Sequence, residues 1–305
     1  MNGLANHVLM VRPYFFKKNL QTASNNFYQS DTELNENKVN ELAVKEFDML
    51  VQSLEEVQIR VTVHQDNKTP DTPDSIFPNN WLSFHNNHQI ILYPMFAPNR
   101  RKERLNNVFD TLKNNGINVK ILLDLTKHED EGKFLEGTGS MVLDRINKKA
   151  YSSLSKRTNK ELVMNFCKKM DYEPVIFSAF QTVSNRRENI YHTNVMMSLG
   201  DNFAVVGLNS IDNLSERNLV IENLKNDNKE IIELSENQLD NFVGNMILLH
   251  NGNEPILLMS SNAFYSLTLF QKKKLSTYAR IKHSPLNLIE KLGGGSARCM
   301  LAEIF

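Results

Sequence analysis

Apolar runs alternate along this chain with segments whose apolar residues recur at a helical period. The run 7–13 is apolar and ends at Pro13, which predicts a buried strand. From Val39 to about Glu56 the apolar residues follow the period of an α-helix, and a β-branched strand is predicted after it, over 58–64. Further helices are predicted over 99–115, 159–170, 214–226 and 262–278, each with extended chain before and after it.

The predicted helices are evenly spaced. They begin near residues 39, 99, 159, 214 and 262, and this spacing of roughly 50 to 60 residues is typical of a repeated supersecondary unit. No obvious sequence identity links the repeats, so the period is one of pattern alone. We therefore expect five ββαβ-like units in an α/β fold, with residues 282–305 supplying strands that complete the first unit. If the units form a ring, their loops converge on one axis, where a site would lie.

The C-terminal segment 292–305 brings a thiol and a guanidinium next to three consecutive glycines. The glycines have no Cβ, which lets the backbone approach a ligand or form a tight turn. Cys299 would act as a nucleophile in its thiolate form, and the neighbouring Arg298 would lower its pKa toward that form. The alternative is that Cys299 is a small apolar residue in a buried terminal strand. The other cysteine, Cys167, lies on the apolar face of the helix predicted over 159–170, which indicates a structural role.

Two further polar residues lie where a predicted strand meets a loop. Glu136 stands between apolar residues and a Gly-x-Gly turn, so we expect it to be partly buried and hydrogen-bonded. His192 opens an apolar strand. Taken singly, they are more simply explained as an ion-paired carboxylate and a packed core histidine. Together with Cys299 they supply a nucleophile, a proton-transfer group and an orienting carboxylate, the set needed to attack an electrophilic carbon.

Composition restricts the partners and the setting. Lys+Arg and Asp+Glu both number 35, so no overall field gathers nucleic acid or an anionic membrane. The two cysteines lie far apart, which argues against a disulfide framework. His85 and His88 have no carboxylate or thiolate close by in sequence, so no metal site is expected. No leader-like N-terminus or long apolar stretch is present, and we expect a cytoplasmic protein without membrane contact.

Four motifs resemble those of a known superfamily. The segments 77–81 (FPNNW), 134–140 (FLEGTGS), 191–194 (YHTN) and 293–300 (GGGSARCM) are similar to motifs of the guanidine-modifying pentein superfamily. That group includes arginine deiminases, dimethylarginine hydrolases, amidinotransferases and succinylarginine dihydrolases. The resemblance covers nearly the whole chain and is closest to the amidinotransferase-like branch named for citrulline utilisation. It implies a single catalytic domain over 1–305, a five-module α/β propeller, and no metal or organic cofactor.

The resemblance also implies catalytic roles by position. Cys299 matches the family nucleophile and His192 the general acid/base. Glu136 matches the carboxylate that orients the histidine and contacts the substrate.

The substrate-binding positions depart from the arginine deiminase pattern. Those enzymes have an aspartate two residues after the catalytic histidine, where this chain has Asn194, and Asn80 matches another of their substrate-binding aspartates. Asp74 is a candidate to replace one of the missing charges. Arg298 is a candidate to hold a substrate carboxylate, with a structural salt bridge as the alternative.

These departures predict a ureido substrate. An asparagine amide can donate to a ureido oxygen and accept from ureido nitrogens, whereas a carboxylate has no proton to donate. We therefore predict that citrulline is hydrolysed to ornithine, ammonia and carbon dioxide in preference to deimination of arginine. The opposing consideration is that succinylarginine dihydrolases use a guanidino substrate with few aspartates, and that Glu136 and Asp74 could still pair with a cation.

Two other hypotheses stay open. One is an amidinotransferase, in which an amine accepts the group in place of water. The other is a non-catalytic metabolite-binding protein of the same fold, which the joint presence of Cys299, His192 and Glu136 disfavours. In each case the expected partner is a small guanidino or ureido amino acid, and the sequence leaves homo-oligomerisation open.

Overall fold

The computed structural model describes residues 3–305, and within them five three-stranded sheets share one topology. In each sheet the first two strands pair antiparallel and the second and third pair parallel. The sheets are β17 (Ala302–Ile304), β1 (His7–Arg12) and β2 (Arg60–Gln65); β3 (Leu82–His85), β4 (Gln89–Leu92) and β5 (Lys120–Asp124); β6 (Val142–Asp144), β7 (Lys149–Ser153) and β8 (Glu173–Phe177); β11 (Met197–Leu199), β12 (Phe203–Val206) and β13 (Glu230–Glu233); and β14 (Ile247–His250), β15 (Pro255–Ser260) and β16 (Arg280–Ser284).

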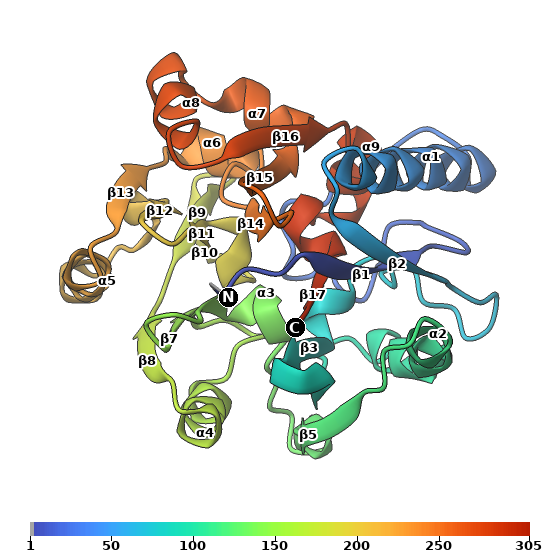
Figure 1. Ribbon diagram of the computed structural model, residues 1–305. Coiled ribbons are helices and arrows are strands. Elements are labelled where there is room, and N and C mark those ends of the chain that lie inside the picture. Colours follow the sequence, from blue (N-terminus) through green and yellow to red (C-terminus); the bar gives the residue numbers. More distant parts are fainter. Residues whose placement is uncertain (1–2) are drawn as a thin grey trace.

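A helical crossover joins the two parallel strands of every sheet, as parallel pairing requires. Figure 1 shows these helices on the outside and the strands toward the middle of the molecule. The crossovers contain α1 (Glu36–Glu55), α2 (Val108–Asn114), α4 (Lys160–Met170), α5 (Leu214–Asn226), and α7 (Ser261–Ser266) with α8 (Leu269–Leu275). The other α-helices of the described residues are α3 (Gly137–Ser140), α6 (Glu236–Asp240) and α9 (Asn287–Gly293); β9 (Phe180–Val183) and β10 (Arg186–Asn189) form a separate hairpin, and short 3₁₀ turns join several elements. The mixed α/β class is confirmed, whereas a closed five-module propeller stays a prediction.

The longest helix, α1, is held by one apolar face. Its buried residues are spaced three or four apart, so they share that face, and they are Val39, Ala43, Phe47, Leu50 and Leu54. Asn35 caps the helix by accepting a hydrogen bond from the amide of Lys38. Burial of each large side chain contributes about 1.5–3 kcal/mol. This face packs in one core cluster with Leu292, Ala297 and Cys299 from the C-terminal segment.

Two predicted helices are wrong in extent. The segment 99–115 divides into a 3₁₀ turn, Arg100–Leu105, and α2, because Asn107 adopts a left-handed conformation with φ 49°. The segment 262–278 divides at Leu267, where Thr268 and Gln271 form a capping box that begins α8. The pattern of apolar positions did not predict α9 or the β9–β10 hairpin.

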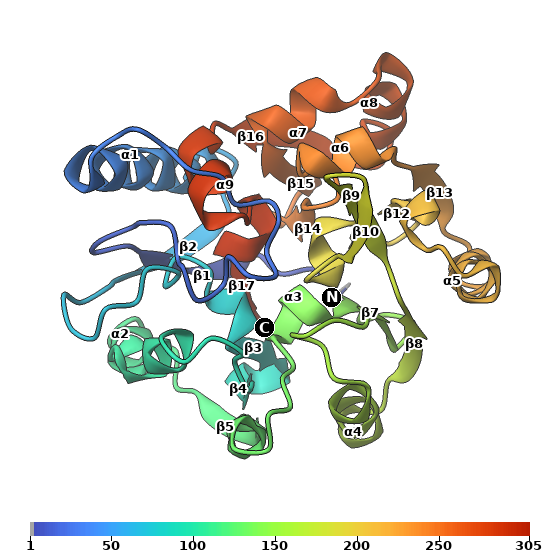
Figure 2. The ribbon, with the colours of Figure 1, turned by 180° about the vertical axis from the view of Figure 1, so that it is seen from behind.

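The two ends of the chain meet in the first sheet. β17 pairs antiparallel with β1, with Ile304 opposite His7, as expected of a C-terminal segment that completes the first unit. Figure 2 shows this strand close to the middle of the molecule, beside α3. Cys299 therefore lies just before a central strand. Of the helices within residues 3–305, none has the length and apolar character to cross a bilayer.

Candidate active site

Cys299 lies in a 3₁₀ turn, Ala297–Met300, between α9 and β17. The turn is reached through Gly294, whose φ of 63° ends α9 and whose missing Cβ leaves room for the side chain of Asn26. The cysteine side chain is buried, with 2% of its surface exposed. Two side-chain amides donate to its sulfur, Asn245 Nδ2 at 3.2 Å and Asn194 Nδ2 at 3.4 Å.

His192 and Glu136 form a buried pair. His192 Nε2 lies 2.8 Å from Glu136 Oε2, and the two side chains are each 1% exposed. Glu136 comes from the start of α3, and its other oxygen, Oε1, accepts from the backbone amide of Phe96 at 3.0 Å. Arg157 Nη1 lies 3.5 Å from Oε2. Glu136 therefore has hydrogen-bonding or ionic partners at both oxygens.

Burial and these neighbours set the protonation states. Burial alone would raise the pKa of Glu136, but Arg157 and the hydrogen bond from His192 outweigh it and lower the pKa to about 2. Burial lowers the pKa of His192 to about 4, against the opposing effect of Glu136. Burial also raises the pKa of the Cys299 thiol, and the hydrogen bonds from Asn245 and Asn194 only partly offset it. At neutral pH the site holds an ionised carboxylate, a neutral imidazole and a neutral thiol.

The pair fixes the histidine tautomer. Because Glu136 is ionised and can only accept, Nε2 carries the ring proton and Nδ1 is left as an acceptor. Nδ1 faces Gly139 of α3, where an added Cβ would lie 2.7 Å from it. His192 can therefore exchange a proton through Nδ1 while Glu136 holds the other nitrogen.

Cys299 and His192 line one small cavity. Its volume is about 10 Å³, roughly the room needed for one water molecule. Its other lining residues are Asn26, Asp74, Phe77, Asn80, Arg100, Arg157, Tyr191, Gly293 and Gly295. An amino acid does not fit this space, so the segment over the cavity must move before one can enter.

Asp74 and Asn80 lie on the cavity wall with Arg100. Asp74 Oδ2 accepts from Asn19 Nδ2 at 2.7 Å, and Arg100 Nε lies 3.8 Å from Oδ2. The other oxygen, Oδ1, is buried and has no hydrogen-bond partner within residues 3–305. Arg100 donates to Asn80 Oδ1 at 2.7 Å and to Glu103 at 2.8 Å. Asp74 thus presents a free carboxylate oxygen beside a fixed guanidinium.

The structure does not bring Arg298 together with these residues. Its side chain lines a different cavity, with Arg145 and Glu303, although Cys299 is the next residue in the chain. The expectation that Arg298 faces the substrate is corrected, because a tight 3₁₀ turn directs successive side chains to different sides. Asn194 contacts the sulfur but is not among the lining residues of the Cys299 cavity.

Several residues of the site had no signal in the sequence. Asn245 donates to the sulfur and also to the backbone oxygen of Asn194, at 2.9 Å. Arg100 and Arg157 belong to charged segments that are typical of a solvated surface, yet each is 2% exposed. The ring of Tyr191 lies against that of His192, with centroids 4.6 Å apart and the ring planes tilted by 44°. No cluster of three or more metal-binding side chains occurs within residues 3–305.

Solved structures of similar fold cover nearly the whole chain. Full-length ArgZ, an arginine dihydrolase from cyanobacteria, shares 19% identity and a TM-score of 0.70, with 97% of this chain and 40% of that chain covered. The N-terminal domain of ArgZ bound to substrate shares 18% identity and a TM-score of 0.70, with 98% and 97% covered. A dimethylarginine dimethylaminohydrolase adduct with S-methyl-L-thiocitrulline shares 14% identity and a TM-score of 0.64, with 98% and 99% covered. The chain spans about two fifths of full-length ArgZ, and at these identities the likeness shows the fold.

No curated protein matches the sequence. The family described as N,N dimethylarginine dimethylhydrolase, eukaryotic, matches residues 12–305, which is nearly the whole chain. The protein therefore belongs to the N,N dimethylarginine dimethylhydrolase family, within the guanidine-modifying pentein superfamily.

Proposed function

We propose that the protein hydrolyses a C–N bond at the terminal guanidino carbon of an amino acid, through a covalent adduct on Cys299. The observation that carries the proposal is that Cys299 and His192 line one buried cavity while ionised Glu136 holds the histidine. We further propose that residues 1–305 act as one catalytic domain, with the five units arranged as a propeller around this cavity.

The proposed reaction has two stages. His192 takes the proton of Cys299, and the sulfur attacks the central carbon to form a C–S bond. The imidazolium then gives that proton to the departing nitrogen as the C–N bond breaks. In the second stage neutral His192 takes a proton from water, whose oxygen attacks the adduct, and cleavage of the C–S bond restores the thiol. Glu136 stabilises the imidazolium in both stages, since it stays ionised.

The part of the cavity lined by Arg157, Arg100 and Asp74, away from Cys299, suits the head group of an α-amino acid. Arg157 donates from Nε and Nη2 to Asn25 and Thr22 of the segment 19–26, so displacement of that segment would free these donors for paired hydrogen bonds to a substrate carboxylate. Arg100 is already engaged by Glu103 and Asn80 and adds its positive charge to this part of the cavity. The free Oδ1 of Asp74 can accept from an ammonium group. A zwitterionic head group would therefore satisfy both kinds of charge, while the side chain of the substrate reaches toward Cys299.

Entry requires displacement of the segment 19–26. Asn19 bonds to Asp74, Asn25 Oδ1 accepts from Arg157 at 2.6 Å, and Asn26 donates to the backbone oxygen of Gly294 at 3.2 Å. Two of these contacts involve the proposed head-group residues. A substrate head group would replace them with its own hydrogen bonds, so binding and opening of the segment are coupled.

Arginine, or an N-alkylated arginine, is the substrate that the comparisons favour. The similar ArgZ is an arginine dihydrolase, and the family takes its name from dimethylarginine. Burial raises the pKa of Cys299, and a guanidinium placed beside the sulfur would favour the thiolate, so a cationic substrate assists its own attack. A neutral ureido group gives no such help.

Citrulline, the substrate predicted from the sequence, is the second candidate. The side chains that touch the sulfur are the amides of Asn194 and Asn245, and the carboxylate of Glu136 is already paired with Arg157. These amides can donate to a ureido oxygen and accept from ureido nitrogens. A free carboxylate for a guanidinium is absent from this part of the described site.

Steady-state kinetics with each substrate decide between the two candidates. We expect kcat/KM to be higher for arginine than for citrulline. The Asn194→Asp variant should raise the arginine preference further, by roughly tenfold, since it adds a carboxylate beside the reacting carbon. Higher kcat/KM for citrulline in the wild type would make citrulline the substrate. A ratio unmoved by Asn194→Asp would show that Asn194 does not contact the reacting group.

The two cysteines provide a matched test of the nucleophile. We expect Cys299→Ser to lower ammonia release by several orders of magnitude, whereas Cys167→Ser should leave it within about twofold. Cys167 is equally buried, but it packs in a separate apolar cluster. Equal losses in both variants, at unchanged folding, would refute the assignment. Addition of an acceptor amine to the same assay detects an amidinotransferase, because the amine then appears in the product.

A further inference from the structure

A buried carboxylate, that of Glu290, lies close to the nucleophile in sequence but takes no part in the proposed reaction. Glu290 belongs to α9, the helix that leads to the turn with Cys299, and it is 3% exposed. Its Oε1 accepts from Ser296 Oγ at 2.5 Å, and its Oε2 accepts from Asn262 Nδ2 at 2.6 Å. Both of these donors are neutral, and burial of a carboxylate that no cation pairs with is costly. Stability alone therefore does not explain this side chain.

Ser296 connects Glu290 to the nucleophile. Ser296 is fully buried and directly precedes the 3₁₀ turn Ala297–Met300. Its backbone oxygen accepts from the amide of Cys299 at 2.9 Å, while its side chain donates to Glu290. Because only two residues separate Ser296 from Cys299, a displacement of Ser296 moves the sulfur as well.

The chain between Glu290 and Ser296 contains three consecutive glycines. The helix ends where the amide of Gly294 donates to the backbone oxygen of Glu290 at 3.0 Å, and Gly294 has a φ of 63°. Glycine has more conformational freedom than any other residue, so a run of three does not by itself fix the residue that follows. The position of Ser296 therefore depends on contacts from outside the glycine run.

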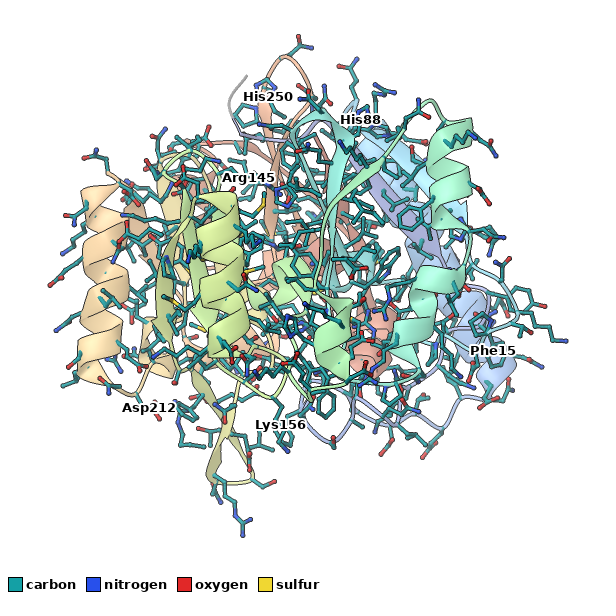
Figure 3. The ribbon with its side chains drawn as sticks, turned by 90° about the horizontal axis from the view of Figure 1, so that it is seen from below. Phe15, His88, Arg145, Lys156, Asp212 and His250 are labelled. Atoms are coloured by element: carbon teal, nitrogen blue, oxygen red, sulfur yellow. The ribbon has the colours of Figure 1, made fainter. Side chains whose placement is uncertain are left out.

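The segment 19–26 covers the cavity from one end of the molecule. Asn25 of this segment accepts from Arg157 at 2.6 Å. Figure 3 shows Lys156, the neighbour of Arg157 in sequence, toward this end and His88 toward the opposite end. Under the proposed function the segment must be displaced before a substrate can enter.

Contacts to the glycine run from this side are lost when the segment moves. Asn26 Nδ2 donates to the backbone oxygens of Gly293 and Gly294 at 3.3 and 3.2 Å. The hydroxyl of Tyr191 also donates to the oxygen of Gly294, but Tyr191 does not belong to the segment. After displacement of Asn26, the contacts of Tyr191 and Glu290 still hold this part of the chain.

The contact between Glu290 and Ser296 can form in both protonation states. Burial raises the pKa of Glu290 to about 7, against the hydrogen bonds from Ser296 and Asn262. The ionised carboxylate accepts from both donors, whereas the acid form can donate to Ser296 Oγ and still accept from Asn262. A glutamine offers the same donor and acceptor as the acid form. Glu290→Gln can therefore keep both contacts, and Glu290→Ala loses both.

We propose that Glu290 is a positioning residue, which holds the turn with Cys299 in place through Ser296 while the segment 19–26 opens for the substrate. The inference rests on the proposed function, because it concerns the same nucleophile. Loss of the contact should displace the sulfur from the reacting carbon and leave the head-group residues where they are. We therefore expect a loss in kcat rather than a rise in KM.

Steady-state kinetics with matched variants test this role. Glu290→Ala should lower kcat by roughly tenfold to a hundredfold with KM within about threefold, and Glu290→Gln should restore kcat to within about threefold of the wild type. Glu46→Ala is the control. Glu46 of α1 accepts from the amides of Leu288 and Ile289 at the start of α9, so its loss weakens the same helix without touching Ser296.

The Tm should fall in Glu290→Ala and Glu46→Ala, whereas kcat should fall in Glu290→Ala alone. Equal kcat losses in these two variants, or no recovery in Glu290→Gln, would overturn the role. If Glu290→Ala does not fold, Ser296→Ala removes the same hydrogen bond from the other side, and wild-type kcat in that variant would overturn the role equally.

Alkylation by iodoacetamide tests the position of the thiol without turnover. Cys299 is 2% exposed, and in the Cys167→Ser background it is the one remaining cysteine. We expect alkylation to be roughly threefold faster or more when Glu290→Ala is added, because release of the turn exposes the sulfur, and to return to the background rate with Glu290→Gln. An unchanged rate in Glu290→Ala would overturn the inference even where arginine is hydrolysed. Absence of hydrolysis by the wild type would contradict the proposed function, and the alkylation rates would still decide whether Glu290 holds the turn.

Discussion

Burial of His192 has a consequence for stability that can be measured. Its pKa of about 4 in the folded protein lies below the ordinary value of 6.5, so the native state holds the neutral ring while the unfolded chain takes up a proton. This contribution to stability is full above about pH 6.5 and is lost as the pH falls toward 4. His192 therefore makes the protein less stable in mild acid.

We predict that the His192→Gln variant is less sensitive to acid than the wild type. Between pH 7 and pH 5 the wild type should lose about 2 kcal/mol more unfolding free energy than the variant, because glutamine takes up no proton. Urea unfolding at the two pH values provides the measurement. The partly exposed His250 serves as the control position, and His250→Gln should follow the wild type. Parallel losses in the wild type and His192→Gln would contradict the assigned pKa.

At the scale of single residues, the sequence predicted the reactive side chains better than the residues that surround them in the site. Cys299, His192 and Glu136 could be selected because a thiol, an imidazole and a carboxylate are each reactive groups placed beside apolar or glycine-rich segments. Arg298 was misplaced because adjacency in sequence does not tell which side of a turn a side chain faces. Asn245 was missed, since an isolated asparagine is common at the surface as well as in a site.

Among the elements, α3 positions the proposed acid/base group. At Gly139 an added Cβ would lie 2.5 Å from Asn80 Nδ2 and 2.7 Å from His192 Nδ1, closer than real Cβ contacts allow. The glycine is therefore required by the close packing of the helix against the histidine ring, since it leaves that space open.

We predict that Gly139→Ala lowers kcat/KM by roughly tenfold to a hundredfold, because it displaces His192 from Glu136. Gly116→Ala is the control. Gly116 has φ of +78° and open space around its Cα, so its substitution should cost about 1 kcal/mol through backbone strain and leave the activity of the folded protein unchanged. Kinetics and thermal unfolding of both variants provide the comparison. Full activity in Gly139→Ala would show that α3 does not position the histidine.

The elements that the sequence predicted well are those with a continuous apolar face. α4 and α5 lie over Lys160–Met170 and Leu214–Asn226, close to the predicted 159–170 and 214–226. The two divided helices were mispredicted because a local capping box in one and a left-handed residue in the other interrupt the helical period. Thr268 and Gln271 begin a new helix inside one continuous apolar pattern. Asn107 turns the chain between the 3₁₀ turn Arg100–Leu105 and α2.

At the scale of the whole molecule, the repeated topology determines where the site lies. The even spacing of helices predicted the five units, since each unit repeats one strand–helix–strand crossover. The pairing of β17 with β1 could be expected only from the leftover strands at the C-terminus, because strand partners far apart in sequence leave no periodic signal. That pairing fixes the turn with Cys299 against the 3₁₀ turn Pro78–Asn80, which in turn contacts α3. The positions of the termini, the nucleophile and the histidine pair are therefore linked.

The central claim is that Cys299 forms a covalent adduct with the guanidino carbon. Its most direct test is intact-protein mass spectrometry after rapid acid quenching of the enzyme mixed with arginine, followed by peptide mapping. We predict a mass increase located at Cys299, absent from Cys299→Ser, and formed more slowly in His192→Gln because His192 also activates the thiol and protonates the leaving nitrogen. Turnover of arginine by Cys299→Ser at the wild-type rate, with no adduct on the wild-type cysteine, would contradict the account.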